Sequence, residues 1–149
     1  MTRFILVLVM LLALGACATL DPNYEEPTVT LSSFKAIPSE GMIPAFEIGL
    51  RIINPNSQTL NLAGVVYTVS LEGYELIKGV GKDFQPIEGY SEGTVKLTAA
   101  ANLITGIRFV TERMQSEGGP VNYEFKAKLD LGGFYPSIRV KESGDINLN

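Results

Sequence analysis

Apolar and polar residues alternate along most of the chain after Thr28, which is the pattern of strands with one buried and one solvent-facing side. The clearest case is Val121–Leu131, in which the alternation is strict over eleven residues. The same pattern predicts further strands, in chain order, over Thr28–Ser33, Ala45–Ile53, Gly64–Leu71, Tyr74–Val80 and Tyr90–Thr98, with short final strands over Ser137–Val140 and Asp145–Leu148.

Short polar segments divide these strands. Glu72-Gly73 is typical of a tight turn in a β-hairpin. Asn54-Pro55-Asn56 ends a strand, because proline cannot donate to a sheet and asparagine tolerates turn dihedrals. We interpret this turn as structural, with side-chain amides that bond the nearby backbone. The alternative is a recognition loop at one end of the fold.

One segment, over about 99–116, departs from the alternation. It carries Leu103, Ile107, Val110 and Met114 at helical spacing, and Gly118-Gly119-Pro120 is typical of a helix end. We expect one amphipathic helix here that packs on an end or side of the sheet. The predicted fold is mainly β, a sandwich of about seven short strands with one helix.

The first residues are typical of an export signal. Arg3 precedes the apolar run Phe4–Ala13, and Leu14-Gly15-Ala16-Cys17 resembles the lipobox of bacterial lipoproteins. The resemblance implies that the Cys17 thiol receives a diacylglyceryl group and that a peptidase cuts before it. The sequence therefore predicts a signal peptide over 1–16, a lipidated N-terminus and tether over 17–27, and a domain over 28–149.

Two other interpretations of the leader remain open. An ordinary secretory signal cut after Ala16 leaves the lone Cys17 unexplained. An uncleaved membrane helix has only Phe4–Leu20 available, at the lower limit of the roughly 17–25 residues that span a bilayer. Ala18 stands where an aspartate would resemble an inner-membrane retention signal, so we expect a lipid-anchored, periplasm-facing protein of the cell envelope, at the outer membrane.

Composition narrows the chemistry. The chain has no histidine, a single cysteine and a net charge of −4, which disfavour acid–base catalysis, thiolate metal sites and nucleic-acid binding. We interpret the loop carboxylates as solvated charges, and we expect no enzyme, no cofactor and no metal. Three tyrosines near turns are the candidate contact surface: Tyr74, Tyr90 and Tyr135.

The order of these segments resembles the LEA type 2 family, which is also known by its water-stress-and-hypersensitive-response (WHy) domain. The residues that carry the resemblance are Phe46–Ile53 with Asn54-Pro55-Asn56, then Leu60–Leu71, Gly79-Val80-Gly81, Val95–Val110 and Gly144–Leu148. The resemblance implies an immunoglobulin- or fibronectin-III-like sandwich and an association with desiccation or other stress. It brings no catalytic site.

The leading hypothesis is a membrane-anchored, non-enzymatic domain that protects or binds envelope components under water stress. One alternative is an adaptor that docks a specific envelope protein, for example by strand addition. The other is a carrier of a lipid or another small ligand inside the sandwich, which requires an apolar cavity well beyond ordinary core voids.

Overall fold

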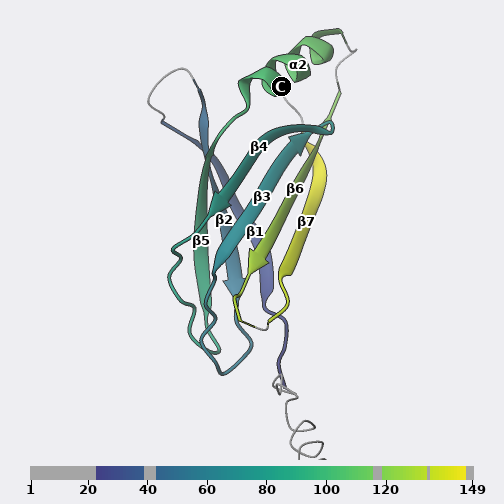
Figure 1. Cartoon of the computed structure of the whole chain (residues 1–149). Helices are drawn as coiled ribbons and strands as arrows, with labels where there is room; N and C mark the ends of the chain where they lie inside the picture. Colours follow the sequence, from purple (N-terminus) through teal and green to yellow (C-terminus); the bar gives the residue numbers. More distant parts are fainter. Residues whose placement is uncertain (1–22, 39–42, 116–118, 134, 147–149) are drawn as a thin grey trace, which may run out of the picture.

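The computed structural model describes residues 23–38, 43–115, 119–133 and 135–146. Within these residues, seven strands form two antiparallel sheets that face each other (Figure 1). One sheet has the order β1-β2-β5, made of β1 (Thr28–Ile37), β2 (Ala45–Ile53) and β5 (Glu92–Ala100). The other has the order β4-β3-β6-β7, made of β3 (Gly64–Leu71), β4 (Tyr74–Gly81), β6 (Val121–Asp130) and β7 (Ile138–Ile146). The predicted immunoglobulin- or fibronectin-III-like sandwich is confirmed.

The core lies between the sheets, where the inward-facing residues of each strand meet. Ile48, Leu50 and Ile52 of β2 are fully buried and oppose Val65 of β3 and Leu129 of β6 in the same apolar cluster. Burial of each such side chain stabilises the fold by about 1.5–3 kcal/mol. The alternation in the sequence therefore identified the buried face correctly.

A bulge in β1 changes which of its residues face inward. The pairing with β2 is interrupted between Leu31 and Ser33. Leu31 faces inward before the interruption, and the next inward-facing residue is Phe34 instead of Ser33. Gly49 lies opposite the bulge, where a Cβ atom would meet the Ser33 Oγ at 2.4 Å. After the bulge, β1 continues to Ile37, four residues beyond the end predicted at Ser33.

The Glu72-Gly73 turn joins β3 to β4 as predicted. Glu72 and Gly73 have φ values of 48° and 80°, which is the left-handed backbone of the hairpin turns whose twist matches the flanking strands. The Glu72 carboxylate also accepts a hydrogen bond from the backbone N–H of Asn122 at 2.6 Å, which ties the turn to β6.

The two short final strands were predicted wrongly, because they form one continuous strand, β7. Glu142 interrupts the apolar alternation in the sequence of this strand, because it puts a carboxylate at an inward-facing position. Its Oε1 accepts a hydrogen bond at 3.0 Å from the backbone N–H of Leu31, on the other sheet. The charged residue thus closes one edge of the sandwich. Leu148 lies outside the described residues.

Helix α2 (Leu103–Gln115) begins four residues later than predicted. Ala99 and Ala100 belong to β5 instead, where they pair with Phe46 and Ala45 of β2. Pairing within the sheet outweighs the helical preference of alanine. Asn102 caps the helix, because its Oδ1 accepts a hydrogen bond from the Thr105 N–H at 3.2 Å. Of the predicted terminator, Gly118 lies outside the described residues.

Helix α2 stands across one end of the sandwich (Figure 1). Phe109 is its buried residue, with 8% of its surface exposed, and it lies off the predicted apolar stripe. The stripe itself is largely open, with Ile107 66% and Met114 81% exposed. In the described part of the chain, no helix is long and apolar enough to cross a bilayer. The predicted leader and Cys17 lie outside that part.

Candidate functional site

The turn after β2 is organised by the side chain of Asn54, which is 1% exposed. Its Nδ2 donates to the carbonyls of Gln58 at 2.8 Å, Glu88 at 3.1 Å and Ile87 at 3.3 Å. Its Oδ1 accepts from the Asn56 backbone N–H at 3.1 Å. A buried amide with all its groups bonded holds two loops together at this end of the sandwich.

Asn56 bonds the segment that precedes the domain. Its Oδ1 accepts from the Glu25 N–H at 2.8 Å, and its Nδ2 donates to the Glu25 carbonyl at 2.7 Å. Pro27, the last residue of this segment, is buried. Residues 23–27, the last part of the expected tether, are therefore held against the domain.

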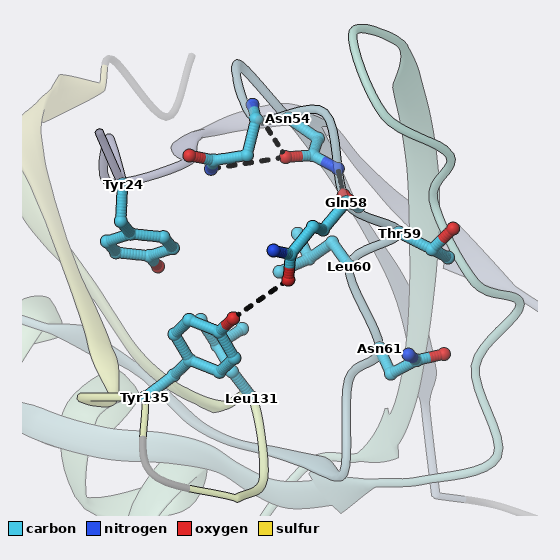
Figure 2. Close-up of a pocket in the computed structure, with 9 residues that line it drawn as sticks. Tyr24, Asn54, Gln58, Thr59, Leu60, Asn61, Leu131 and Tyr135 are labelled. Carbon is cyan, nitrogen blue, oxygen red and sulfur yellow. Dashed lines mark hydrogen bonds between the residues drawn. The ribbon is translucent and has the colours of Figure 1, made fainter. Parts of the chain in front are cut away.

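A pocket of about 230 Å³ lies beside this attachment (Figure 2). Its lining carries no charged side chain and consists of Tyr24, Asn54, Asn56, Gln58, Thr59, Leu60, Asn61, Leu131 and Tyr135. The rings of Tyr24 and Tyr135 lie 5.1 Å apart, and the Tyr135 hydroxyl donates to Gln58 Oε1 at 3.2 Å. We call this the polar pocket.

The hydroxyl of Tyr24 is buried and has no hydrogen-bond partner. Among the described residues, every other buried side-chain nitrogen or oxygen has one. Burial raises the pKa of Tyr24 above its ordinary value, and the neighbouring Glu26 carboxylate and Tyr135 raise it further. The hydroxyl is therefore protonated at neutral pH and has an unused hydrogen bond to give.

A much larger cavity lies at the other end of the sandwich, under α2. Its volume is about 830 Å³, and both sheets and the helix contribute to its walls. The lining residues are Leu31, Phe34, Pro44, Phe46, Val69, Leu71, Leu76, Ile77, Ala101, Asn102, Leu103, Gly106, Ile107, Phe109, Val110, Thr111, Tyr123, Phe125 and Ile146. We call it the apolar groove, because only Asn102, Thr111 and Tyr123 bring polar side-chain groups to it.

The groove exists because α2 is held at a distance from most of the sandwich. The helix contacts β4, where the Phe109 ring meets Tyr74 edge-on at 6.3 Å. At its start, the Asn102 N–H donates to the Leu76 carbonyl at 2.7 Å. The stripe residue Ile107 consequently faces an open cavity instead of a packed sheet. The features of the sequence that could have indicated the groove are the apolar stripe of α2 and Phe34. However, the helical spacing of the stripe does not distinguish a residue on a groove wall from one on a packed face.

The three candidate tyrosines do not form one surface. Tyr74 lies under α2, and its hydrogen bond with the Glu112 carboxylate is the main cause that raises its pKa. Tyr90 lies near the Asn54 turn, 78% exposed, with a φ of 53°. Tyr135 lines the polar pocket. Tyr74 thus lies at one end of the sandwich, whereas Tyr90 and Tyr135 lie at the other end.

The described residues contain no group of three potential metal ligands among histidine, cysteine, aspartate and glutamate. Carboxylates of β5 and β4 have local partners. Glu92 pairs with Arg51 across the strands, and Glu75 lies 3.7 Å from the Lys78 ammonium. These exposed pairs are of the kind that contribute little to stability.

Solved structures with the same fold come from distant sequences. A solution structure of a protein from Arabidopsis thaliana matches with a TM-score of 0.67 at 12% identity, covering 89% of this chain and 91% of that one. A crystal structure of a protein from Archaeoglobus fulgidus matches with a TM-score of 0.59 at 14% identity, covering 80% of this chain and 100% of that one. A solution structure of a protein named as late embryogenesis abundant (LEA) matches at 0.57 and 15% identity, covering 99% and 85%.

None of the proteins with curated descriptions matches the chain in sequence. The family model of the late embryogenesis abundant proteins, LEA type 2, matches residues 49–144, which run from the middle of β2 almost to the end of β7. This family points to a role in water stress without catalysis. The match covers most of the sandwich, and the chain therefore belongs to the LEA type 2 family.

Proposed function

We propose that this protein is a membrane-anchored, non-enzymatic lipoprotein that takes up the acyl chain of a lipid in the apolar groove. The observation that supports the proposal is the groove itself, with its volume of about 830 Å³ and its apolar walls. Pockets for small ligands commonly measure about 300–1,000 Å³. The cavity required by the carrier hypothesis is thus present.

The chemistry of the walls favours an acyl chain over a polar ligand. Phe34, Phe46 and Ile107 line the groove, and each of them keeps part of its apolar surface exposed. Transfer of a methylene group from water into such surroundings is favourable by about 0.8 kcal/mol. A chain of a dozen or more methylenes therefore gains enough to leave water, whereas a charged headgroup finds no ion-pair partner among the lining residues.

The proposed anchor brings the domain close to lipid. With Cys17 lipidated, only residues 17–22 separate the membrane from the attached segment, and at about 3.3–3.6 Å each they reach about 20 Å at most. The groove opens at the other end of strands of eight to ten residues, roughly 30 Å away. A domain on this tether stays beside its membrane at the periplasmic face, where we propose the outer membrane.

Water stress gives the groove a use. Loss of water crowds envelope components together and disturbs lipid packing, so apolar chains become available outside the bilayer. A tethered domain that covers such a chain protects neighbouring surfaces from aggregation. A deletion strain that survives drying and osmotic shock as well as its parent would argue against this part of the proposal.

A photoreactive fatty acid tests the groove directly. Cells that produce the full-length protein are fed the probe and irradiated, and crosslinked peptides are mapped by mass spectrometry. Crosslinks are expected on α2 and on the peptides that carry Phe34 and Phe46. Crosslinks spread evenly over the outer faces of the sheets would contradict the proposal, and one stoichiometric crosslinked protein in place of lipid would favour an adaptor.

The anchor needs a separate test. The Cys17→Ser variant is expected to lose incorporation of labelled palmitate and to leave the membrane fraction. A processed variant that stays with the membrane would overturn the lipoprotein assignment without affecting the groove.

A further inference from the structure

We propose that the polar pocket binds a neutral, hydroxyl-rich ring, which is the chemistry of a sugar. The pocket lies at the tether end of the sandwich, and the inference is independent of the apolar groove. It follows from three observations: the unpartnered Tyr24 hydroxyl, the uncharged lining, and the mixture of amide, aromatic and apolar surface in a small volume.

The Tyr24 hydroxyl indicates a missing partner. A buried polar group without a hydrogen bond destabilises a protein by about 1–3 kcal/mol, so folded proteins rarely keep one. Tyr24 lines the polar pocket, and its hydroxyl oxygen is covered by the surrounding residues. A ligand that turns the Tyr24 ring as it enters the pocket, and that carries a hydroxyl of its own, gives Tyr24 the bond it lacks.

The lining selects a neutral ligand. Gln58 and Tyr135 each carry groups that donate and accept, which suits hydroxyls, since these also do both. None of the nine lining residues carries a charge to pair with an ionised ligand. The carboxylate of Glu26, close enough to raise the pKa of Tyr24, further disfavours an anion.

The shape also fits a single ring. Figure 2 shows the Tyr135 hydroxyl bonded to the Gln58 amide, with the Tyr24 ring beside this pair, Leu60 next to Gln58 and Leu131 next to Tyr135. A sugar has apolar C–H faces and polar edges, so it matches aromatic and leucine surfaces and an amide at once. The volume of about 230 Å³ is below the range of larger ligand sites, which limits the occupant to about one ring.

Binding is coupled to the tether. Tyr24 belongs to the segment that precedes the domain, and Asn56, which also lines the pocket, holds Glu25 by two hydrogen bonds. The pocket is therefore complete only while this segment is attached. An occupant stabilises the attachment in turn, because linked equilibria are reciprocal.

Two sources supply the same neutral ring: free sugars that accumulate as water is lost, and the glycan chains of the cell wall. The experiment uses the full-length protein in a detergent without sugar headgroups. It is titrated with a neutral disaccharide and, separately, with a neutral glycan fragment of the cell wall, and binding is followed by saturation-transfer NMR. Binding of the disaccharide assigns free sugars, whereas binding of the fragment alone assigns the wall.

The Tyr24→Phe variant removes only the hydroxyl. Affinity is expected to fall about three- to tenfold, which is the effect of one lost neutral hydrogen bond. Thermal stability without ligand is expected to stay equal or rise, since the lost group has no partner. The matched control is Tyr90→Phe, whose hydroxyl lies outside the pocket. Absence of saturable binding of both sugars, or equal affinity of the Tyr24→Phe and wild-type proteins, would overturn the inference.

Discussion

Asn56 holds the backbone of Glu25 as a neighbouring strand would, with one hydrogen bond donated and one accepted at 2.7 and 2.8 Å. This side chain joins the proposed anchor segment to the domain, in addition to the contact of the Tyr24 and Tyr135 rings. The attachment completes the polar pocket, and under the proposed lipidation of Cys17 it would also set how far the sandwich can move from a membrane.

The Asn56→Ala variant is expected to release residues 23–27 without unfolding the sandwich. Two partly exposed hydrogen bonds are lost, so the free energy of unfolding should fall by about 1–2 kcal/mol. Amide exchange at Glu25 should accelerate far more than exchange in β2. Ser57→Ala, at an exposed neighbouring position, is the control. Unchanged protection of the Glu25 amide would show that Asn56 does not hold the segment.

Asn54 is expected to matter much more than Asn56. Replacement by alanine leaves the carbonyls of Gln58, Glu88 and Ile87 without their shared donor in a buried site. The free energy of unfolding should fall by about 2–4 kcal/mol, as measured by urea denaturation. A loss no larger than that of the Asn56→Ala variant would contradict the central role of Asn54 in this turn.

Much of the fold follows from the alternation of residues, because burial of one sheet face is a local property of each strand. The parts that were missed depend on distant partners. Glu142 is an inward-facing charge that makes sense only beside the Leu31 N–H, 111 residues away in the chain. Alanines with helical preference became strand because β2 lies beside them.

The sites were harder to predict than the fold. The stripe of α2 was recognised, but Phe109 decides where the helix rests, and its contact with Tyr74 is a tertiary one. Tyr24 lies in a segment without periodicity, and its neighbour Tyr135 comes from a loop at the far end of the sequence. No local pattern brings two such residues together.

Acid should weaken a charge cluster on the outer face of β6 and β7. The Lys126 ammonium group and, to a smaller extent, that of Lys141 bond the Glu124 carboxylate and lower its pKa below the ordinary value of 4.5. A lowered folded-state pKa means that the stabilisation is present above pH 4.5 and is lost as the pH falls through the folded value. The effect is small because the groups are exposed.

The Glu124→Gln variant tests this cluster through urea midpoints measured from pH 6 down to about pH 3. The wild type should be the more stable protein at the upper end, and the two midpoints should converge in acid. A difference between the two proteins that stays constant over this range would show that the ionisation of Glu124 does not contribute. Added salt should reduce the difference.

Gly106 allows the groove to be closed without damage to the helix. It lies in the interior of α2 and lines the groove, and a Cβ atom built there meets no atom within 4 Å. Alanine should therefore stabilise the helix by about 0.5–1 kcal/mol while leaving the groove open. Phenylalanine at the same position should fill the groove.

The most direct test of the account compares crosslinking of the photoreactive fatty acid to Gly106→Phe and Gly106→Ala in the membrane. We predict that the yield on groove peptides falls about tenfold or more in the phenylalanine variant, since each 1.4 kcal/mol of lost binding is a factor of ten. The alanine variant should match the wild type. Equal yields from a folded Gly106→Phe variant and the wild type would contradict the claim that the groove holds an acyl chain.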